Sequence, residues 1–226
     1  MCGRGILNLW IITLFSLLAG TVYGLIAVCQ VSGKITEAKS RGVYDFLCLT
    51  PSGAWRVNWA LCTGALHRNN ALHAIFILVA CSAVFTSLHL LSIILRGFEP
   101  TLDTAVGSII LLSVTIPFLL FTDYAQSLVI ASLIGMIAPT YASNRTEARL
   151  VGVAAFLTIQ TGAYLLWILL ATMSRATGGG WAVIAIAAAL IVSIIRELAV
   201  VILTRTLARR LDCLSHELDF KAETPV

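Results

Sequence analysis

Long apolar runs separated by short polar stretches dominate the pattern of the chain. The runs cover residues 6–31, 71–95, 104–122, 124–142, 150–174 and 178–200, the last of which contains Arg196 and Glu197. Their lengths lie near the 20 or so residues that a helix needs to cross a hydrocarbon core of about 30 Å. Polar residues do not alternate with apolar ones, as they do in a membrane barrel. The pattern therefore predicts an all-α fold, a polytopic transmembrane helix bundle of about six membrane segments.

Composition strengthens this prediction. Hydrophobic residues make up 59% and charged residues 12% of the 226 residues, against about 45–50% and about 25% in soluble domains. Large exposed apolar surfaces promote association in water, whereas lipid solvates them. The run over 6–31 is longer than the 7–15 residues of a signal-peptide core, so we interpret it as a retained span. We expect a single membrane domain over 1–226 in a cell membrane, such as the bacterial inner membrane.

Two polar segments carry most of the positive charge. The segment 33–70 holds five Lys and Arg residues against Glu37 and Asp45, and the tail 205–226 begins with Arg205, Arg209 and Arg210. Loops rich in Lys and Arg stay in the cytoplasm. Both segments are therefore predicted to be cytoplasmic, with the N-terminus outside.

These two placements conflict with six full crossings, because five crossings after residue 70 would leave the tail outside. The stretch 104–142 is the suspect, since it contains Pro117, Asp123 and Pro139. It forms either two tight crossings or one re-entrant hairpin, which would need protein around it. On this interpretation Asp123 marks a turn at the interface. Arg196 and Glu197 are expected to have a structural role at the membrane edge.

The segment 33–70 is predicted to form two short interfacial helices. Over 37–49 the spacing places Phe46 and Leu47 on one apolar face, and Pro51 ends this helix. The following helix carries Trp55, a residue type that is enriched at membrane interfaces.

Candidate catalytic chemistry is sparse. The six cysteines are scattered without a C-x-x-C pair, and the chain has no G-x-S-x-G, H-E-x-x-H or phosphate-loop motif. We therefore predict no enzyme activity and no catalytic, cofactor-binding or metal site. No basic stretch interleaves with aromatic residues, so no nucleic-acid partner is expected. A haem or pigment contact at His89, within the run 71–95, remains an open alternative.

Small residues recur along the first apolar run. Ser16, Gly20 and Gly24 follow one another at intervals of four residues. This spacing lets two helix backbones approach closely in a membrane. It predicts a helix–helix contact, either within the chain or with a partner.

One stretch resembles a known family. Residues 37–52 read E-A-K-S-R-G-V-Y-D-F-L-C-L-T-P-S, which is similar to the cytoplasmic loop of type-2 ABC exporter permeases. In that family the loop forms a coupling helix that docks on a separate ATPase subunit. The resemblance implies a membrane-spanning subunit that couples a partner ATPase to substrate movement. The implied partner-docking residues are Glu37, Gly42, Tyr44, Leu47, Thr50 and Pro51, to which the amphipathic pattern adds Phe46 and Trp55.

A second function remains open beside the first. The family has a further span ahead of this loop's own span, and here that span is not seen. The chain is then a half, a shortened relative or a subunit that no longer transports. The alternative is a non-catalytic structural or accessory subunit of a larger respiratory or photosynthetic complex. Both hypotheses predict the lipid bilayer and other subunits as partners, in an oligomer.

Overall fold

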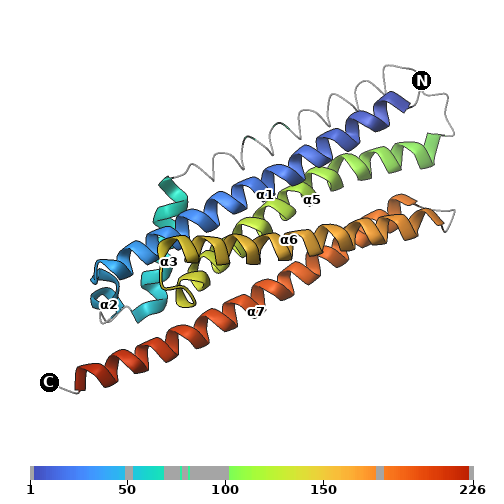
Figure 1. Cartoon of the computed structure of the whole chain (residues 1–226). Coiled ribbons are helices and arrows are strands. Elements are labelled where there is room, and N and C mark those ends of the chain that lie inside the picture. The colour runs from blue at the N-terminus through green and yellow to red at the C-terminus, as the bar shows by residue number, and fades with distance from the viewer. Residues whose placement is uncertain are drawn as a thin grey trace.

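A computed structural model describes residues 3–48, 53–68, 77, 81, 102–176 and 181–223. All regular elements among them are helices, which confirms the all-helical part of the prediction. They are α1 (Gly3–Ser40), α2 (Val43–Cys48), α3 (Gly53–Arg68), α5 (Leu102–Ile137), the short 3-10 helix η1 (Ala138–Thr140), α6 (Arg145–Ala176) and α7 (Trp181–Glu223) (Figure 1). Most of the predicted run 71–95, His89 included, lies outside the described residues.

The helices α1 and α5 run in the same direction. Gly20 of α1 lies beside Asp123 of α5, and further along both helices Val31 lies beside Gly135. The helix α7 also runs in this direction, because residues further along α7 contact residues further along α5. The helix α6 runs the opposite way and contacts α1, α5 and α7 (Figure 1).

The helix α5 is continuous through Pro117 and Asp123. The predictions of two segments over 104–122 and 124–142, of a re-entrant hairpin and of a turn at Asp123 are therefore wrong. A proline removes one backbone donor and kinks a helix without necessarily ending it. The charge of Asp123 does not end the helix either, because Arg196 of α7 compensates it inside the bundle.

The C-terminal ends of α1, α5 and α7 gather at one end of the molecule, where α6 begins. Lys39 Nζ donates to the carbonyl oxygen of Pro139 at 3.1 Å, and the Arg210 guanidinium lies 4.6 Å from the centroid of the Tyr141 ring. We call this the basic end; it carries Lys34, Lys39, Arg41, Arg145, Arg149, Arg205, Arg209 and Arg210. The N-terminal ends of α1, α5 and α7 and the C-terminal end of α6 lie at the opposite end (Figure 1).

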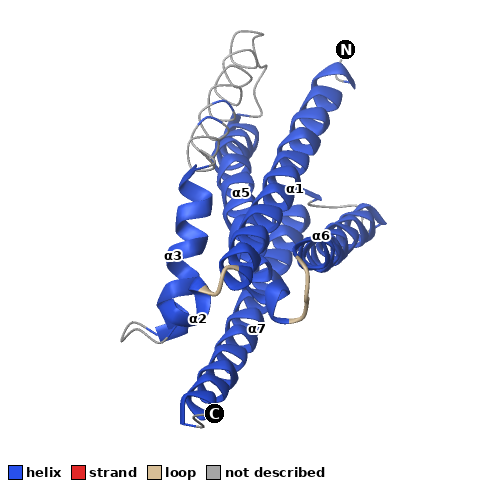
Figure 2. Cartoon of the chain, turned by 60° about the vertical axis from the view of Figure 1, so that its left-hand side comes forward, coloured by secondary structure: helices blue, strands red, loops and turns tan. Residues whose placement is uncertain are grey.

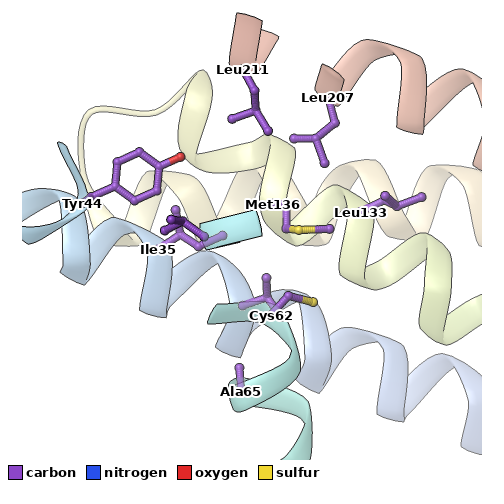
Figure 3. Close-up of a cluster of buried hydrophobic side chains, with 10 residues drawn as sticks. Ile35, Tyr44, Cys62, Ala65, Leu133, Met136, Leu207 and Leu211 are labelled. Carbon is purple, nitrogen blue, oxygen red and sulfur yellow. The ribbon is translucent and has the colours of Figure 1, made fainter. Parts of the chain in front are cut away.

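The short helices α2 and α3 pack against the basic end of the bundle, on the flank away from α6 (Figure 2). A buried apolar cluster joins them to the long helices. It contains Val31, Ile35, Tyr44, Val57, Cys62, Ala65, Leu133, Met136, Leu207 and Leu211, most of which are labelled in Figure 3. Since these residues come from α1, α2, α3, α5 and α7, one core holds the short helices and the bundle together.

Several polar side chains are buried beside the apolar core, and many large apolar side chains are exposed, which is unusual for a water-soluble protein. The buried set includes Arg196, Gln160, Asn58 and Ser127. The outer faces of α6 and α7 instead expose large apolar side chains, among them Ile194 at 68%. Two stretches, Phe121–Thr140 and Arg145–Leu170, are long and apolar enough to cross a membrane.

We predict that Gly24→Ala destabilises the bundle by about 1–3 kcal/mol, the usual cost of overpacking a core. A Cβ at Gly24 would lie 2.3 Å from the ring of Phe156, which is fully buried and cannot move aside. The control is Gly162→Ala on α6, where a Cβ meets nothing within 4 Å. This control should be neutral or stabilising by up to about 1 kcal/mol. Thermal unfolding in mild detergent measures both, and equal effects of the two substitutions would contradict this packing.

Candidate functional site

A buried ion pair connects α5 to α7. Arg196 Nη1 donates to Asp123 Oδ1, to the Asp123 main-chain oxygen at 3.3 Å and to Ser127 Oγ at 3.3 Å. The Arg196 side chain is 2% exposed and that of Asp123 18%. Removing one partner of such a pair costs about 3–5 kcal/mol, because the other charge is then left uncompensated. The pair therefore fixes how α7 lies against α5.

A set of hydrogen bonds extends from the ion pair to the other two long helices. Gln160 Nε2 of α6 donates to Tyr164 Oη at 2.5 Å, Ser127 Oγ at 3.2 Å and Thr21 Oγ1 at 3.3 Å. Thr21 Oγ1 and Tyr164 Oη are also 3.1 Å apart. The Tyr164 ring centroid lies 5.5 Å from Arg196 Cζ, which is cation–π distance. One polar cluster thus contacts all four long helices.

A second contact lies on the outer side of the ion pair. Gln126 Nε2 donates to Ser193 Oγ at 2.8 Å and to Glu197 Oε1 at 2.9 Å. Glu197 is exposed, whereas its neighbour Arg196 points into the bundle. Asp123 thus gives Arg196 a partner in the interior of the bundle, which the sequence pattern did not indicate.

Two of the three predicted packing residues lie at contacts between helices of this chain. A Cβ at Gly20 would lie 3.6 Å from Asp123 Oδ2, and one at Gly24 would overlap the Phe156 ring. The side chain of Ser16 lies outside the described residues. The contact at Gly20 would accept a methyl group at ordinary van der Waals distance, whereas the contact at Gly24 would not.

The polar cluster does not have the form of a catalytic centre. Its only described carboxylate next to the buried arginine is Asp123, and that carboxylate is held by the Arg196 guanidinium. No group of three or more His, Cys, Asp or Glu side chains suited to a metal ion occurs among the described residues. The arrangement compensates a buried charge and fixes the helices against one another.

The predicted helix over 37–49 is interrupted, because α1 continues to Ser40 and α2 begins only at Val43. Gly42 (φ 68°) precedes α2 and Gly53 (φ 70°) opens α3. Both have left-handed backbone conformations that glycine adopts without strain. Asn58 Nδ2 donates to Tyr44 Oη at 2.7 Å, and Lys39 Nζ lies 5.3 Å from the Tyr44 ring centroid. These contacts tie α2 to α3 and to the end of α1.

The predicted docking residues divide between the interior and the surface. Tyr44 is 3% exposed, so its side chain supports the segment from within and is not available to a partner. Leu47 is half-buried and packs against the apolar cluster. Gly42 and Trp55 are exposed, and the Trp55 ring packs edge-on against Trp59 at a centroid distance of 6.0 Å.

The remaining docking residues are only partly described. The side chain of Phe46, and residues Thr50 and Pro51 entirely, lie outside the described residues. Glu37 is partly exposed and pairs with Lys34 at 3.5 Å and Arg41 at 2.6 Å. The positive charges of Lys34 and then of Arg41 hold the pKa of the Glu37 carboxyl below its usual value. Glu37 is thus already engaged with two cations of the same helical segment.

Sequence reasoning missed the pairing of Asp123 with Arg196. A signal for it exists, because each residue interrupts an otherwise apolar run and the two charges are opposite in sign. Ionisable residues within membrane segments pair with one another. Their separation of 73 residues hides the partnership from any local pattern.

We predict that Asp123→Asn and Arg196→Met each destabilise the protein by about 3–5 kcal/mol, because each leaves a buried charge or a buried polar group uncompensated. The double variant should be no more destabilised than either single one, since no unpaired charge remains. Thermal unfolding of the three variants in mild detergent measures the coupling. Additive losses would show that the two side chains act independently.

No protein-family model matches the chain, and no curated protein or solved structure matches it significantly. The functional argument therefore rests on the geometry of the described residues and on the loop resemblance at residues 37–52.

Proposed function

We propose that the chain is a multi-pass subunit of a cell membrane that crosses the bilayer five times and couples a cytoplasmic ATPase to movement of a substrate. The observation that carries the proposal is the attachment of α2 and α3 to the basic end of the long helices by one buried core. The proposal has three parts, which concern the membrane, the number of crossings and the coupling.

A location in the membrane is supported by apolar side chains on the outside of the bundle and a charged side chain within it. Ile194, Leu198 and Leu165 are exposed on α7 and α6, while Arg196 is buried. Arg196 lies nine residues before Arg205, or about 14 Å along a helix. This is about half of a hydrocarbon core of roughly 30 Å. The ion pair then lies near the centre of the bilayer, where an unpaired charge costs at least about 2.5–3.5 kcal/mol.

The number of crossings follows from α5. Since α5 is one helix, the crossings are α1, the run 71–95, α5, α6 and α7. Four crossings after residue 70 return the tail to the side of residues 33–70. The helices α1, α5 and α7 run in the same direction, which supports this count. They would be the first, third and fifth crossings, and these all end on the side of the basic end. That end is then cytoplasmic by the positive-inside rule.

The coupling part rests on the mechanical connection of α2 and α3. Val57 of α3, Ile35 of α1 and Leu207 of α7 share the buried cluster. A partner that displaces α3 therefore displaces the cytoplasmic ends of membrane helices, because packed interiors transmit strain. The resemblance of residues 37–52 to the coupling loop of exporter permeases supports an ATPase as that partner. The exposed face around Trp55 and Arg56 is the surface we assign to docking.

For the crossings, we predict that Asn144→Cys and Arg209→Cys label from the same side of the membrane and that Ala176→Cys labels from the other. Each is placed singly in a cysteine-free background, in intact cells, with a membrane-impermeant maleimide. Asn144 and Arg209 lie at the basic end, and Ala176 ends α6 at the opposite end. Labelling of all three from one side would contradict five crossings.

For the coupling, we predict that Trp55→Ala weakens binding of the nucleotide-binding subunit by about tenfold or more, as expected for an exposed aromatic anchor. The full chain is purified with its partners in mild detergent, and the ATPase is identified by photolabelling with an azido-ATP. The thermal unfolding temperature should change little, because Trp55 is 37% exposed and does not belong to the buried apolar cluster.

The matched control is Tyr141→Ala, an exposed aromatic at the same end but outside α2 and α3. It should leave the ATPase bound. Recovery of the wild-type chain without any nucleotide-binding subunit would overturn the coupling proposal. Equal losses from Trp55→Ala and Tyr141→Ala would overturn the assignment of docking to α3.

A further inference from the structure

Two arginines at the start of α6 converge on one point of α1. Gly33 has no side chain there, and a Cβ built on it would lie 2.9 Å from Arg149 Nη2, 3.1 Å from Arg149 Nε and 3.4 Å from Arg145 Nε. Both guanidinium groups therefore lie side by side against the backbone of α1. Gly33 itself is buried beneath them.

Neither arginine forms a salt bridge in the part of the chain that the structure describes, although the Glu37 carboxylate is near enough for its charge to interact with that of Arg145. The ion pairs at this end join Glu37 to Lys34 and Arg41, and the Glu147 carboxylate accepts from Ser143. The Nε atom of Arg149 is buried and has no hydrogen-bond partner. Two adjacent guanidinium groups repel each other, and the buried Nε donor of Arg149 without an acceptor is costly. An anion between them would relieve both effects.

The position of this pair indicates what kind of anion it is. Gly33 lies two residues after the apolar run 6–31 ends, and the exposed Lys34 comes next. On α6 the residues after Arg149 are Leu150 and Val151, which are exposed at 65% and 40%. A charged spot is thus followed, toward the bilayer centre, by an exposed apolar strip. A lipid has the same order of charged head group and acyl chains.

We propose that Arg145 and Arg149 bind the phosphate group of an anionic lipid on the cytoplasmic side, against Gly33 and beside Lys34. A guanidinium presents its N–H donors in a planar fork that matches phosphate oxygens. Basic pockets between membrane helices on the cytoplasmic side bind anionic head groups in this way. The bound lipid clamps α1 to α6 just before α1 leads into α2. This site is independent of the proposed ATPase coupling, though it requires that the chain lies in a membrane.

The test compares lipid binding by the full chain and by Arg145→Gln/Arg149→Gln, both purified in mild detergent. Phosphatidylglycerol and phosphatidylcholine are titrated separately, and bound lipid is counted by native mass spectrometry. The wild type should prefer phosphatidylglycerol. The double variant should lose about tenfold or more of that affinity, as expected when charge-assisted hydrogen bonds are removed.

The matched control is Arg209→Gln/Arg210→Gln, which removes the same charge from the same end. This control variant should keep its affinity for phosphatidylglycerol within about twofold. Exposed charges contribute little by non-specific attraction, less than a guanidinium that forms two hydrogen bonds to a phosphate. Equal losses in the two double variants would overturn the site. Displacement of the lipid by millimolar inorganic phosphate would assign the site to a free oxyanion and overturn the lipid. If Arg145→Gln/Arg149→Gln lost a protein partner but still bound phosphatidylglycerol, the lipid proposal would also be overturned.

A second variant keeps both arginines. In Gly33→Ala the new methyl group occupies the point on which the guanidinium groups converge, and the flexible end of Arg149 must move away. We expect reduced phosphatidylglycerol binding with a nearly unchanged unfolding temperature. Unchanged lipid binding by this variant would contradict a site built against Gly33, even if the double arginine variant does not fold.

Discussion

The interaction on which the structure depends is the ion pair between Asp123 and Arg196. A guanidinium buried among apolar helices is tolerated only where a carboxylate and further acceptors surround it. Here Asp123 and Ser127 of α5 provide these, and the Tyr164 ring of α6 lies nearby. Because these groups come from different helices, the cost of an unpaired charge specifies how the helices are positioned.

The polar interior has consequences for the exterior and for the basic end. With polar groups inside, the outer faces of α6 and α7 consist largely of exposed apolar side chains, which suits lipid. The same packing brings the C-terminal ends of α1, α5 and α7 together. At that end Tyr44 and Asn58 hold α2 and α3 on the bundle. The parts proposed for docking are therefore connected rigidly to the parts proposed to lie in the membrane.

The sequence predicts the long helices well, because an apolar run of about 20 residues has few other ways to satisfy its backbone. It fails at Asp123, since a charged residue inside an apolar run looks locally like a turn. Its partner is 73 residues away, and only tertiary packing reveals the pairing. The basic tail conflicted with two crossings over 104–142, and the structure has one continuous helix there, neither two segments nor a hairpin.

The docking residues show a similar division. The loop resemblance names residues within 37–52 for docking, but it does not distinguish supporting from exposed side chains. Tyr44 is buried because Asn58 and Lys39 approach it from α3 and α1. Trp55 faces outward because the opposite side of α3 packs on the cluster through Val57 and Cys62. That choice of face depends on contacts with helices remote in sequence.

The most direct test of the account is the environment of the outer face beside the buried ion pair. Nitroxide labels at Ile194 and Leu198, introduced one at a time in the full chain reconstituted into bilayers, report accessibility to oxygen and to a water-soluble nickel chelate. Both residues are among the most exposed on α7. The account predicts high oxygen accessibility and almost none to the chelate, as expected for lipid contact near the bilayer centre. High accessibility to the nickel chelate would place this face in water and contradict a membrane bundle built around Asp123 and Arg196.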